Sequence, residues 1–568
     1  MIDYSASDAP IDLLIWQGIE GSPCPEDFQN YLRHSPEGAA HLDDAIERLI
    51  ELDDADAVCA NDESRYPAVI AAIKKLAEAG DAVAQFHMGK LHDIGIGIEV
   101  NINRAEGWYR LAILQGELRS HINLALGLEK RGKPEDIDEM KRLLATASAA
   151  NEDAGAFNLA RMISRGYGEI DERPNPASAF ELFHQSWEQG SALAAYWIGY
   201  MLLQGNGVRQ DSVLGRDWIV RSARAGCIGA IIKLGGDAEY GSGCEKDPSA
   251  AVEWFRQGAE LGSMECQHRL AGLLLRGEGI AKDGAQAVQW LKRAAVRGNA
   301  DAQRVLGLAY LWGIDVIRNI RFGRKWLTRA AEQDDAYAAY QLGKHLQNAE
   351  PPELESAAQW FERAAKLGDS TAQSVLGACY WNGHGVVADD HAAFKWIKLS
   401  SMQGDSHGLY LLGRLYYSGV DVPVDLKHAA KYFRQSAERG HSGGQAKLGW
   451  CYLKGQGVDR DVAEGMLWLS RAAERDDGEA STIIGYVLRD GIGVQRNSGE
   501  ASKWFLSAAE KGDARGQFEL AWLYAEGDGL ERNLVEATKW MEKAAAQGEE
   551  DAVKWLADQV ARANIEIL

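Results

Sequence analysis

Small and aromatic residues recur at fixed intervals along most of this 568-residue chain. One series of small residues begins at Gly199 and advances in steps of 36 residues, with a single 34-residue step between Gly343 and Gly377. A second series, of aromatic residues, runs from Trp218 to Trp540 and contains the same shortened step. Because two separate series share one irregularity, the chain is an array of repeats.

The spacing within a repeat predicts two helices. A large apolar residue precedes the small one and a bulky residue follows it by three, as Leu412 and Tyr416 do around Gly413. These flanking positions are four apart and therefore share a helix face. Glycine pairs such as Gly455 and Gly457 end the first helix, since a residue just past a helix end often takes a positive φ. The recurrent aromatic residue marks the second helix, and we expect its ring to fill the space beside small residues.

The repeats define the predicted organisation of the chain. Regular copies occupy residues 191–549, and degenerate copies occupy 67–190. Residues 1–66 are expected to form an atypical helical cap, and residues 550–568 a C-terminal capping helix. A single repeat cannot bury its apolar face, so neighbours must stack. We therefore predict an all-α fold, a right-handed α-solenoid superhelix of about thirteen helix-turn-helix repeats with a 36-residue period.

The succession Leu-Gly-x-x-Tyr, Gly-x-Gly-Val, Ala-x-x-Trp and Ala-Ala-x-x-Gly, well represented in residues 442–477, resembles the Sel-one-like repeat (SLR). That repeat is a 36-residue relative of the tetratricopeptide repeat, and the resemblance extends over most of the chain. It implies adaptor, regulatory or toxin-neutralising roles through protein binding, generally without catalysis. Some secreted relatives fix each repeat with a regular cysteine pair, which this chain lacks.

The charge balance narrows the range of partners. There are 83 acidic and 61 basic side chains, a net charge of −22. A surface this acidic repels phosphate backbones and anionic lipids, which argues against binding to nucleic acid or membranes. The first 66 residues are especially acidic, with sixteen Asp and Glu against three Arg.

The compartment expected from the sequence is the cytoplasm. The first residues lack the basic segment of a secretory signal, and no apolar run approaches the roughly 20 residues of a membrane helix. The seven cysteines form no Cys-x-x-Cys and no recurring spacing. Reduced thiols in a bacterial-type cytoplasm are the simplest interpretation.

Motifs for catalysis or cofactor binding are not evident. The 13 histidines include no His-Glu-x-x-His, and the pairs His87/His92 and His384/His391 are spaced poorly for one helix face. The Gly-x-Gly turns lie between predicted helices and lack the full dinucleotide fingerprint. We expect no cofactor, no metal and no catalytic residue, so an enzyme, such as a hydrolase, is the least favoured alternative.

A stripe on each first helix is the candidate partner-binding surface. Positions −3, +1 and +4 from the small residue are i, i+4 and i+7 and share a face. By resemblance to tetratricopeptide-like solenoids, this face lines the concave groove. Tyrosine, tryptophan and arginine dominate binding hot spots. The candidate residues are Tyr196, Tyr200, Arg304, Tyr340, Lys344, Trp381, Tyr410, Arg414, Tyr417, Trp450, Tyr486, Arg489, Phe518 and Trp522. Alternatively, some of these rings only pack between neighbouring first helices.

Basic residues within that stripe contrast with the acidic chain and predict a partner segment that carries carboxylates or a C-terminal acid group. The main hypothesis is a protein–protein interaction scaffold or adaptor. The alternative is an immunity protein that neutralises a toxin or effector, and a basic toxin would suit the net charge. A further hypothesis is that the acidic residues 1–66 occupy the groove in cis, although this charge also suits a solvated end.

Overall fold

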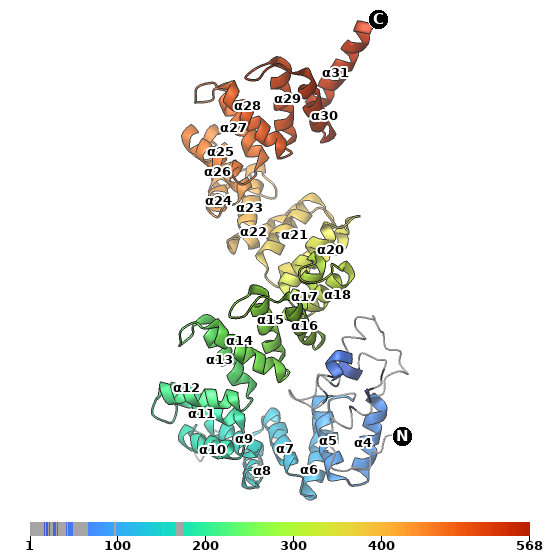
Figure 1. The fold of residues 1–568 in the computed structure, drawn as a ribbon, viewed down its shortest axis with the longest axis vertical. Coiled ribbons are helices and arrows are strands. Elements are labelled where there is room, and N and C mark those ends of the chain that lie inside the picture. The colour runs from blue at the N-terminus through green and yellow to red at the C-terminus, as the bar shows by residue number, and fades with distance from the viewer. Residues whose placement is uncertain are drawn as a thin grey trace. The chain divides into compact units, whose positions relative to one another are not determined.

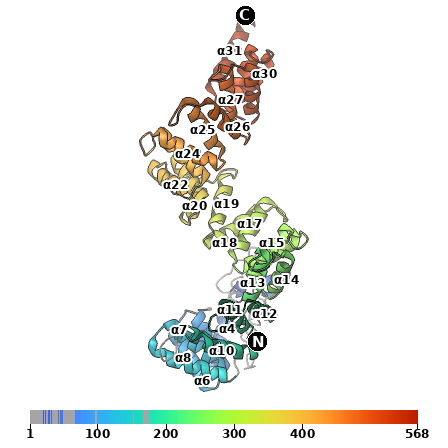
Figure 2. The same cartoon turned by 90° about the vertical axis from the view of Figure 1, so that its left-hand side faces the viewer.

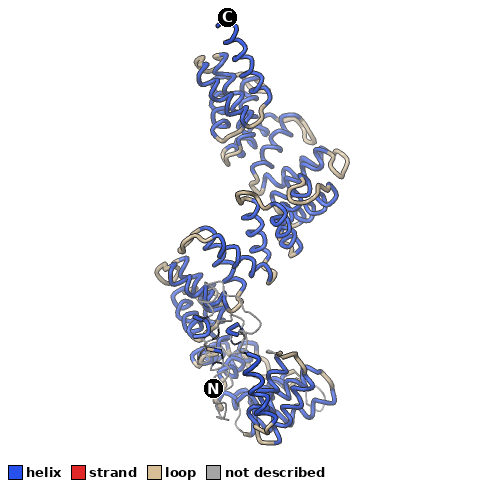
Figure 3. Tube along the Cα trace, turned by 90° about the vertical axis from the view of Figure 1, so that its right-hand side faces the viewer, coloured by secondary structure: helices blue, strands red, loops and turns tan. Residues whose placement is uncertain are grey.

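A computed structural model describes residues 66–567 except 96–97, 151–152 and 166–173. From the preceding segment it describes residues 16, 19, 20, 22, 27–29, 31, 41 and 44–48. Over these residues the regular structure is helical throughout, with no strand (Figure 3). The chain divides into two compact units, an N-terminal unit (Met1–Ala330) and a C-terminal unit (Ala331–Leu568), and each is described by itself.

The N-terminal unit is built from consecutive helical hairpins (Figure 1). Its first helices are α5 (Ala82–Ile94), α7 (Leu118–Arg131), α9 (Asp153–Ser164), α11 (Ala192–Gln204), α13 (Ile228–Tyr240), α15 (Met264–Arg276) and α17 (Ala300–Trp312). Its second helices are α4 (Tyr66–Glu78), α6 (Ile102–Leu114), α8 (Ile137–Ala149), α10 (Pro176–Glu188), α12 (Ser212–Arg224), α14 (Pro248–Glu260), α16 (Gly284–Val296) and α18 (Ile320–Glu332). A 3₁₀ turn, η1 (Pro134–Asp136), precedes α8. The division between the two units falls within α18.

The C-terminal unit continues the same pattern (Figure 2). Its first helices are α19 (Ala336–Gln347), α21 (Ser370–Asn382), α23 (Ser406–Ser418), α25 (Ser442–Lys454), α27 (Gly478–Asp490) and α29 (Ala514–Glu526). Its second helices are α20 (Leu354–Lys366), α22 (Asp390–Met402), α24 (Leu426–Glu438), α26 (Val462–Ala473), α28 (Ser498–Glu510) and α30 (Leu534–Ala546), and α31 (Glu550–Ile567) follows them. The all-α class and the solenoid of stacked hairpins are confirmed.

Capping residues fix where these helices begin and end. The carboxylate of Asp369 accepts the backbone N–H of Ala372 at 2.6 Å and starts α21. Gly383 ends that helix in the left-handed region, with φ of 70°, and donates its N–H to the carbonyl of Cys379. An Asp or Asn at the start and a left-handed Gly at the end satisfy backbone groups that a helix leaves unpaired. The expected glycine stops are therefore confirmed.

The second glycine of several Gly-x-Gly connections has an additional role. Gly385 also has a positive φ, 73°. A Cβ atom placed on it would overlap the carbonyl oxygen of Leu354, the first residue of α20 in the preceding repeat. Gly457 meets the carbonyl of Leu426 in the same way. Glycine at these two positions lets the connection lie directly against the backbone of the repeat before it.

The side chain that fills each hairpin core is not the recurrent aromatic residue but the residue after it. The expectation that the aromatic ring would fill this space was wrong, since most of these rings, including Trp468, are only half-buried. The neighbouring residues have an exposed fraction of at most 2%: Ile219, Phe255, Leu291, Leu327, Phe361, Ile397, Phe433, Leu469, Phe505 and Met541. A Cβ atom on Gly413 would overlap the ring of Phe433. Small residues of the first helix therefore make room for this neighbouring residue.

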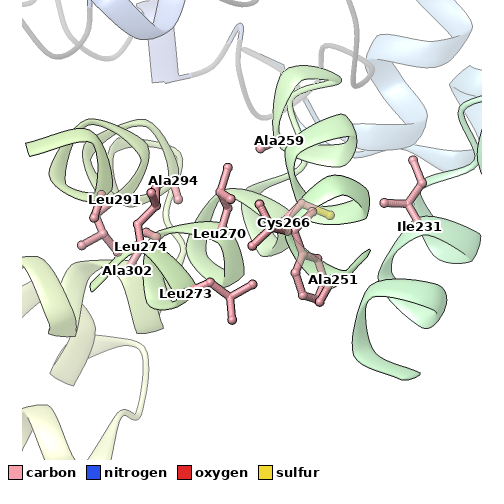
Figure 4. Close-up of a cluster of buried hydrophobic side chains, with 14 of the residues drawn as sticks. Ile231, Ala251, Ala259, Cys266, Leu270, Leu273, Leu274, Leu291, Ala294 and Ala302 are labelled. Carbon is pink, nitrogen blue, oxygen red and sulfur yellow. The ribbon is translucent and has the colours of Figure 1, made fainter. Parts of the chain in front are cut away.

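The cores of neighbouring hairpins are continuous within the N-terminal unit. Leu270, Leu273 and Leu274 of α15 belong to one buried cluster with Leu291 of α16 and Ala302 of α17 (Figure 4). Each first helix therefore packs on the second helix of its own repeat and on the second helix of the preceding repeat. This is the stacking that single repeats require in order to bury their apolar faces.

Most of the predicted cap, residues 1–66, lies outside the described residues. Those that are described add to the N-terminal unit: Trp16 and Phe28 are buried in a cluster that includes Ile73 of α4. The carboxylate of Glu47 also pairs with Arg293 of α16 at 2.9 Å. The described contacts of this segment are thus with helices of its own unit. None of the described helices has the length and apolarity that a bilayer crossing requires.

Candidate partner-binding groove

A cavity of about 560 Å³ lies along successive first helices of the C-terminal unit. Residues from α23, α25, α27 and α29 line it, together with one from α24. They are Arg414, Tyr417, Ser418, Phe433, Lys447, Trp450, Glu479, Thr482, Ile483, Tyr486, Asp513 and Arg515. We call this cavity the groove. It contains four of the predicted partner-binding residues: Arg414, Tyr417, Trp450 and Tyr486.

Arg414 lies over two aromatic rings at one end of the groove. Its guanidinium carbon is 4.7 Å from the ring centroid of Trp381 and 5.7 Å from that of Tyr410. These distances allow cation–π attraction, which holds the side chain in place. Among the described residues no carboxylate pairs with this exposed guanidinium, and none accepts a hydrogen bond from it. The charge is thus positioned but not neutralised.

Two other basic residues of the first helices, the predicted Lys344 and also Lys454, behave similarly. Lys454 lies over Trp450, with 4.7 Å between Nζ and the ring centroid, and Lys344 is exposed on α19. Neither forms an ion pair with a described carboxylate. Lys447, in contrast, pairs with Glu479 at 2.6 Å. On this face of the first helices, unpaired positive charge therefore lies on α19, α23 and the end of α25.

Farther along, carboxylates already engage the basic residues. The side chain of Glu519, 5% exposed, accepts a hydrogen bond from the Tyr486 hydroxyl at 2.7 Å and pairs with both Arg489 and Arg515. Arg515 also pairs with Glu549 at 2.7 Å. Burial raises the pKa of Tyr486 above its usual range, so this hydroxyl stays protonated. This end of the groove is an internally satisfied network.

Two histidines stack with Tyr410 beside Arg414. The ring centroids of Tyr410 and His441 are 4.8 Å apart, and those of Tyr410 and His407 are 6.3 Å apart. The Nδ1 atom of His441 accepts the backbone N–H of Gly444 at 3.1 Å, which caps α25. Burial lowers the pKa of His441 to about 4, and His407 adds to this effect. Burial also lowers the pKa of His407, so both rings are neutral at pH 7.

The other predicted residues lie along the same kind of helix but outside this cavity. Tyr340 packs on Phe361, with ring centroids 6.0 Å apart, and Phe518 lies beneath Arg515. Trp522 is 38% exposed. Tyr196, Tyr200 and Arg304 belong to the N-terminal unit and do not line the groove. All fourteen predicted residues are half-buried or exposed, so none of these rings is sealed in the core.

Three arginines on the first helices of the N-terminal unit are paired with carboxylates. Arg269 and Arg276 both pair with Glu239, at 3.1 and 3.0 Å. Arg304 pairs with Asp301 on its own helix. The positive charges of these three arginines are therefore neutralised within the chain, whereas the charge of Arg414 in the C-terminal unit is not.

Several groove residues escaped the sequence analysis. Arg515 stands six positions before the small residue Ala521, one helical turn ahead of the predicted stripe. Lys447 stands at −2, just beside the stripe. Thr482 occupies a stripe position but is neither aromatic nor basic. Extending the same face by one turn would have included Arg515.

Within the described ranges, no group of three or more His, Cys, Asp or Glu side chains is placed to hold a metal ion. The described cysteines, Cys227, Cys244, Cys266, Cys379 and Cys451, are free thiols. Cys24 and Cys59 lie outside the described residues.

A family model of the Sel1 repeat matches twelve segments of this chain. They are residues 82–117, 153–191, 192–227, 229–263, 265–299, 300–335, 336–369, 370–405, 406–441, 442–477, 479–513 and 514–549. Residues 118–152, which belong to the stretch of degenerate copies predicted at 67–190, are not among these segments, although α7 and α8 form a hairpin there.

Known proteins give the same picture. The Sel1-like repeat-containing protein L21 of Acanthamoeba polyphaga mimivirus is 28% identical over 140 residues, which are 24% of this chain and 25% of the viral protein. The chain thus spans about a quarter of the length of that relative. The crystal structure of c5321, a protective antigen of uropathogenic Escherichia coli strains with an SLR fold, is 24% identical. It covers 85% of this chain and 97% of its own, with a TM-score of 0.59.

A Sel1 repeat protein from Oxalobacter formigenes is 26% identical, covering 64% of this chain and 93% of its own with a TM-score of 0.35. The family match is the stronger finding, because it extends over well more than half of the chain. Proteins built from this repeat act as protein-interaction scaffolds. The chain belongs to the Sel1-repeat family.

Proposed function

We propose that this chain is a non-catalytic scaffold or adaptor that binds a partner protein through the groove of its C-terminal unit. The observation that carries the proposal is a row of half-buried rings on consecutive first helices. Tyr417, Trp450 and Tyr486 line the cavity of about 560 Å³. Trp381 and Tyr410 lie next to it, beneath the guanidinium of Arg414. Such rings bury large areas at low cost in side-chain entropy, so a partner segment that covers them gains affinity.

The polar groups of the groove support binding rather than catalysis. Asp513 caps α29, accepting the N–H of Gly516 at 2.6 Å and the hydroxyl of Thr482 at 2.7 Å. Glu479 is paired with Lys447. Because these carboxylates are committed to structural contacts, the features that remain for a ligand are the rings and Arg414.

The cytoplasm is the compartment we propose for this activity. The described cysteines are all free thiols, as expected in a reducing environment.

Selection from a library of random short peptides on the full chain tests the proposal. We expect the triple variant Trp381→Ala, Tyr410→Ala and Trp450→Ala to bind the selected peptides at least about tenfold more weakly, since hot-spot rings dominate affinity. Circular dichroism should show unchanged helicity. The control is Tyr240→Ala, which removes an exposed ring of the N-terminal unit. Unchanged affinity in the triple variant would show that the groove is not the binding surface.

A second candidate is an immunity protein that neutralises a toxin or effector by stoichiometric binding. One observation favours it, the net charge of −22, which would steer a basic toxin toward the chain. Its test is a salt dependence, argued below at the scale of the whole molecule.

A further inference from the structure

Arg414 differs from the other cations that line the groove. Lys447 is paired with Glu479, and Arg515 is paired with Glu549 and Asp551. Arg414 contacts only ring faces and has no carboxylate partner among the described residues. It is thus the one cation in this described lining whose charge is available to a ligand.

The way Arg414 is held leaves its hydrogen-bond donors free. A guanidinium is planar, and its five N–H donors lie in its own plane. The rings of Trp381 and Tyr410 attract the charge without consuming those donors. An immobilised guanidinium with free donors is suited to a planar two-oxygen acceptor, which it can bind through two parallel hydrogen bonds.

The surroundings of Arg414 indicate what lies next to that acceptor. Tyr417 and Trp450 line the same cavity, and the neutral His407 and His441 stack beside Tyr410. A volume of about 560 Å³ falls within the range of sites that enclose small ligands. Bulky apolar side chains next to the acceptor would therefore displace water from these rings.

Resting on the proposed function, we infer that the groove recognises a carboxylate-bearing segment of another protein. Arg414 binds the carboxylate in a bidentate pair, and a neighbouring apolar side chain of the segment enters the cavity between Tyr417, Trp450 and Tyr486. Charge complementarity argues for this occupant, because Arg414 is held over ring faces and has no carboxylate partner among the described residues. The carboxylate belongs to an Asp or Glu side chain or to a C-terminus.

A double-mutant cycle with a peptide selected on the full chain tests this inference. Each Asp or Glu of the peptide is replaced in turn by Asn or Gln, and its C-terminal acid is replaced by an amide. One of these changes should weaken binding to the wild-type chain about tenfold to a hundredfold. In Arg414→Gln the same peptide change should have little effect. The position that responds identifies which carboxylate is bound. The control Arg434→Gln removes a guanidinium that lies over Tyr452 and does not line the groove, so it should retain the full effect.

The outcomes separate the two proposals. If peptides lose affinity for the ring variants but tolerate every change of carboxylate to amide, the groove binds a partner and the role of Arg414 is wrong. An effect of the carboxylate that persists in Arg414→Gln also overturns that role. A library that gives no groove-dependent binder overturns both proposals. Self-association of the full chain that disappears in Arg414→Gln would assign the groove to a second copy instead.

Discussion

Leu469 and Trp468 are adjacent in α26 but occupy different environments. Leu469 is fully buried and lies in front of Gly449, where a Cβ atom would overlap it. Trp468 is half-buried, lies 4.7 Å beneath the guanidinium of Arg471 and donates its indole N–H to Glu464 at 2.8 Å. The side chain of Leu469 is thus sealed in the core, whereas part of the Trp468 ring faces solvent.

We predict that Leu469→Ala lowers the free energy of unfolding by about 2–5 kcal/mol, because it leaves a cavity between α25 and α26. Trp468→Ala should lower the free energy of unfolding by less, since part of its ring already faces solvent. Amide hydrogen exchange in α25 and α26 measures both changes and reports on local opening. A larger loss of protection for Trp468→Ala would contradict this assignment of the core.

The difficulty of finding this core position from sequence has a physical cause. The tryptophan position is chemically uniform and so stands out as a series, whereas the buried position holds Phe, Leu, Ile or Met. A core tolerates different apolar residues of suitable volume. The most visible periodic residue therefore marked the second helix correctly without being the residue at its centre.

At the scale of elements, α25 has an unusual N-cap. Most first helices begin with Asp, Asn or Ser, as α21 does with Asp369, but α25 begins with His441. Its Nδ1 atom can accept the N–H of Gly444 only when unprotonated. Neighbouring His407 and the carboxylate of Asp405 are the charged or titratable groups that act on its pKa.

This cap predicts a pH-dependent stability. The pKa of folded His441 is about 4, below the ordinary 6.5, so the unfolded chain binds this proton first as the pH falls. Stability present above pH 6.5 should therefore be lost progressively toward pH 4. We expect His441→Asn, which retains an acceptor at the cap, to show a smaller drop in Tm over this interval.

Thermal unfolding followed by circular dichroism at several pH values measures this drop. His391→Asn, which removes a solvent-exposed histidine of α22, serves as the control and should behave as wild type. An identical pH dependence in His441→Asn would refute the role of this cap. Because burial also lowers the pKa of His407, part of the drop should remain in the variant.

A second regularity at this scale joins neighbouring hairpins. The buried side chains of Gln373, Gln445 and Gln517 donate hydrogen bonds to the carbonyls of Ala365, Ala437 and Ala509, at 3.1 to 3.2 Å. Each of these bonds connects a first helix to the second helix of the repeat before it. This glutamine recurs eight residues after its partner, but it belongs to neither the apolar nor the aromatic series from which the helices were predicted.

For the whole molecule, period and helix face were enough to predict the all-α solenoid, because stacking is what repeats of this kind must do. The sequence also placed Arg414, Tyr417 and Trp450 on one face, and they line one cavity. What it did not show is which cations remain unpaired. The pairs of Arg269 and Arg276 with Glu239 depend on packing between hairpins and have no signature in the spacing.

The net charge of −22 supports one prediction at this scale. If the chain neutralises a basic toxin, the association rate constant should fall roughly tenfold or more from low to physiological ionic strength, since long-range steering is screened by salt. Stopped-flow mixing of the full chain with a purified basic candidate toxin, at several salt concentrations, measures this rate constant. Association that is insensitive to salt would exclude electrostatic capture and leave the scaffold as the remaining role.

The glutamine bonds between hairpins also bear on how such a chain can change length. The eight-residue separation of Gln373 from Ala365 survives the shortened 34-residue repeat, because the missing residues fall at the end of α19, which has 12 residues where α21 has 13, and in the connection from α19 to α20. If residues 406–441 were excised, Gln445 would stand eight residues after Ser401 and meet an equivalent carbonyl. Gain or loss of whole repeats thus preserves the glutamine hydrogen bond between neighbouring hairpins. An insertion or deletion that changes the eight-residue separation by even one residue leaves a buried carbonyl without its donor.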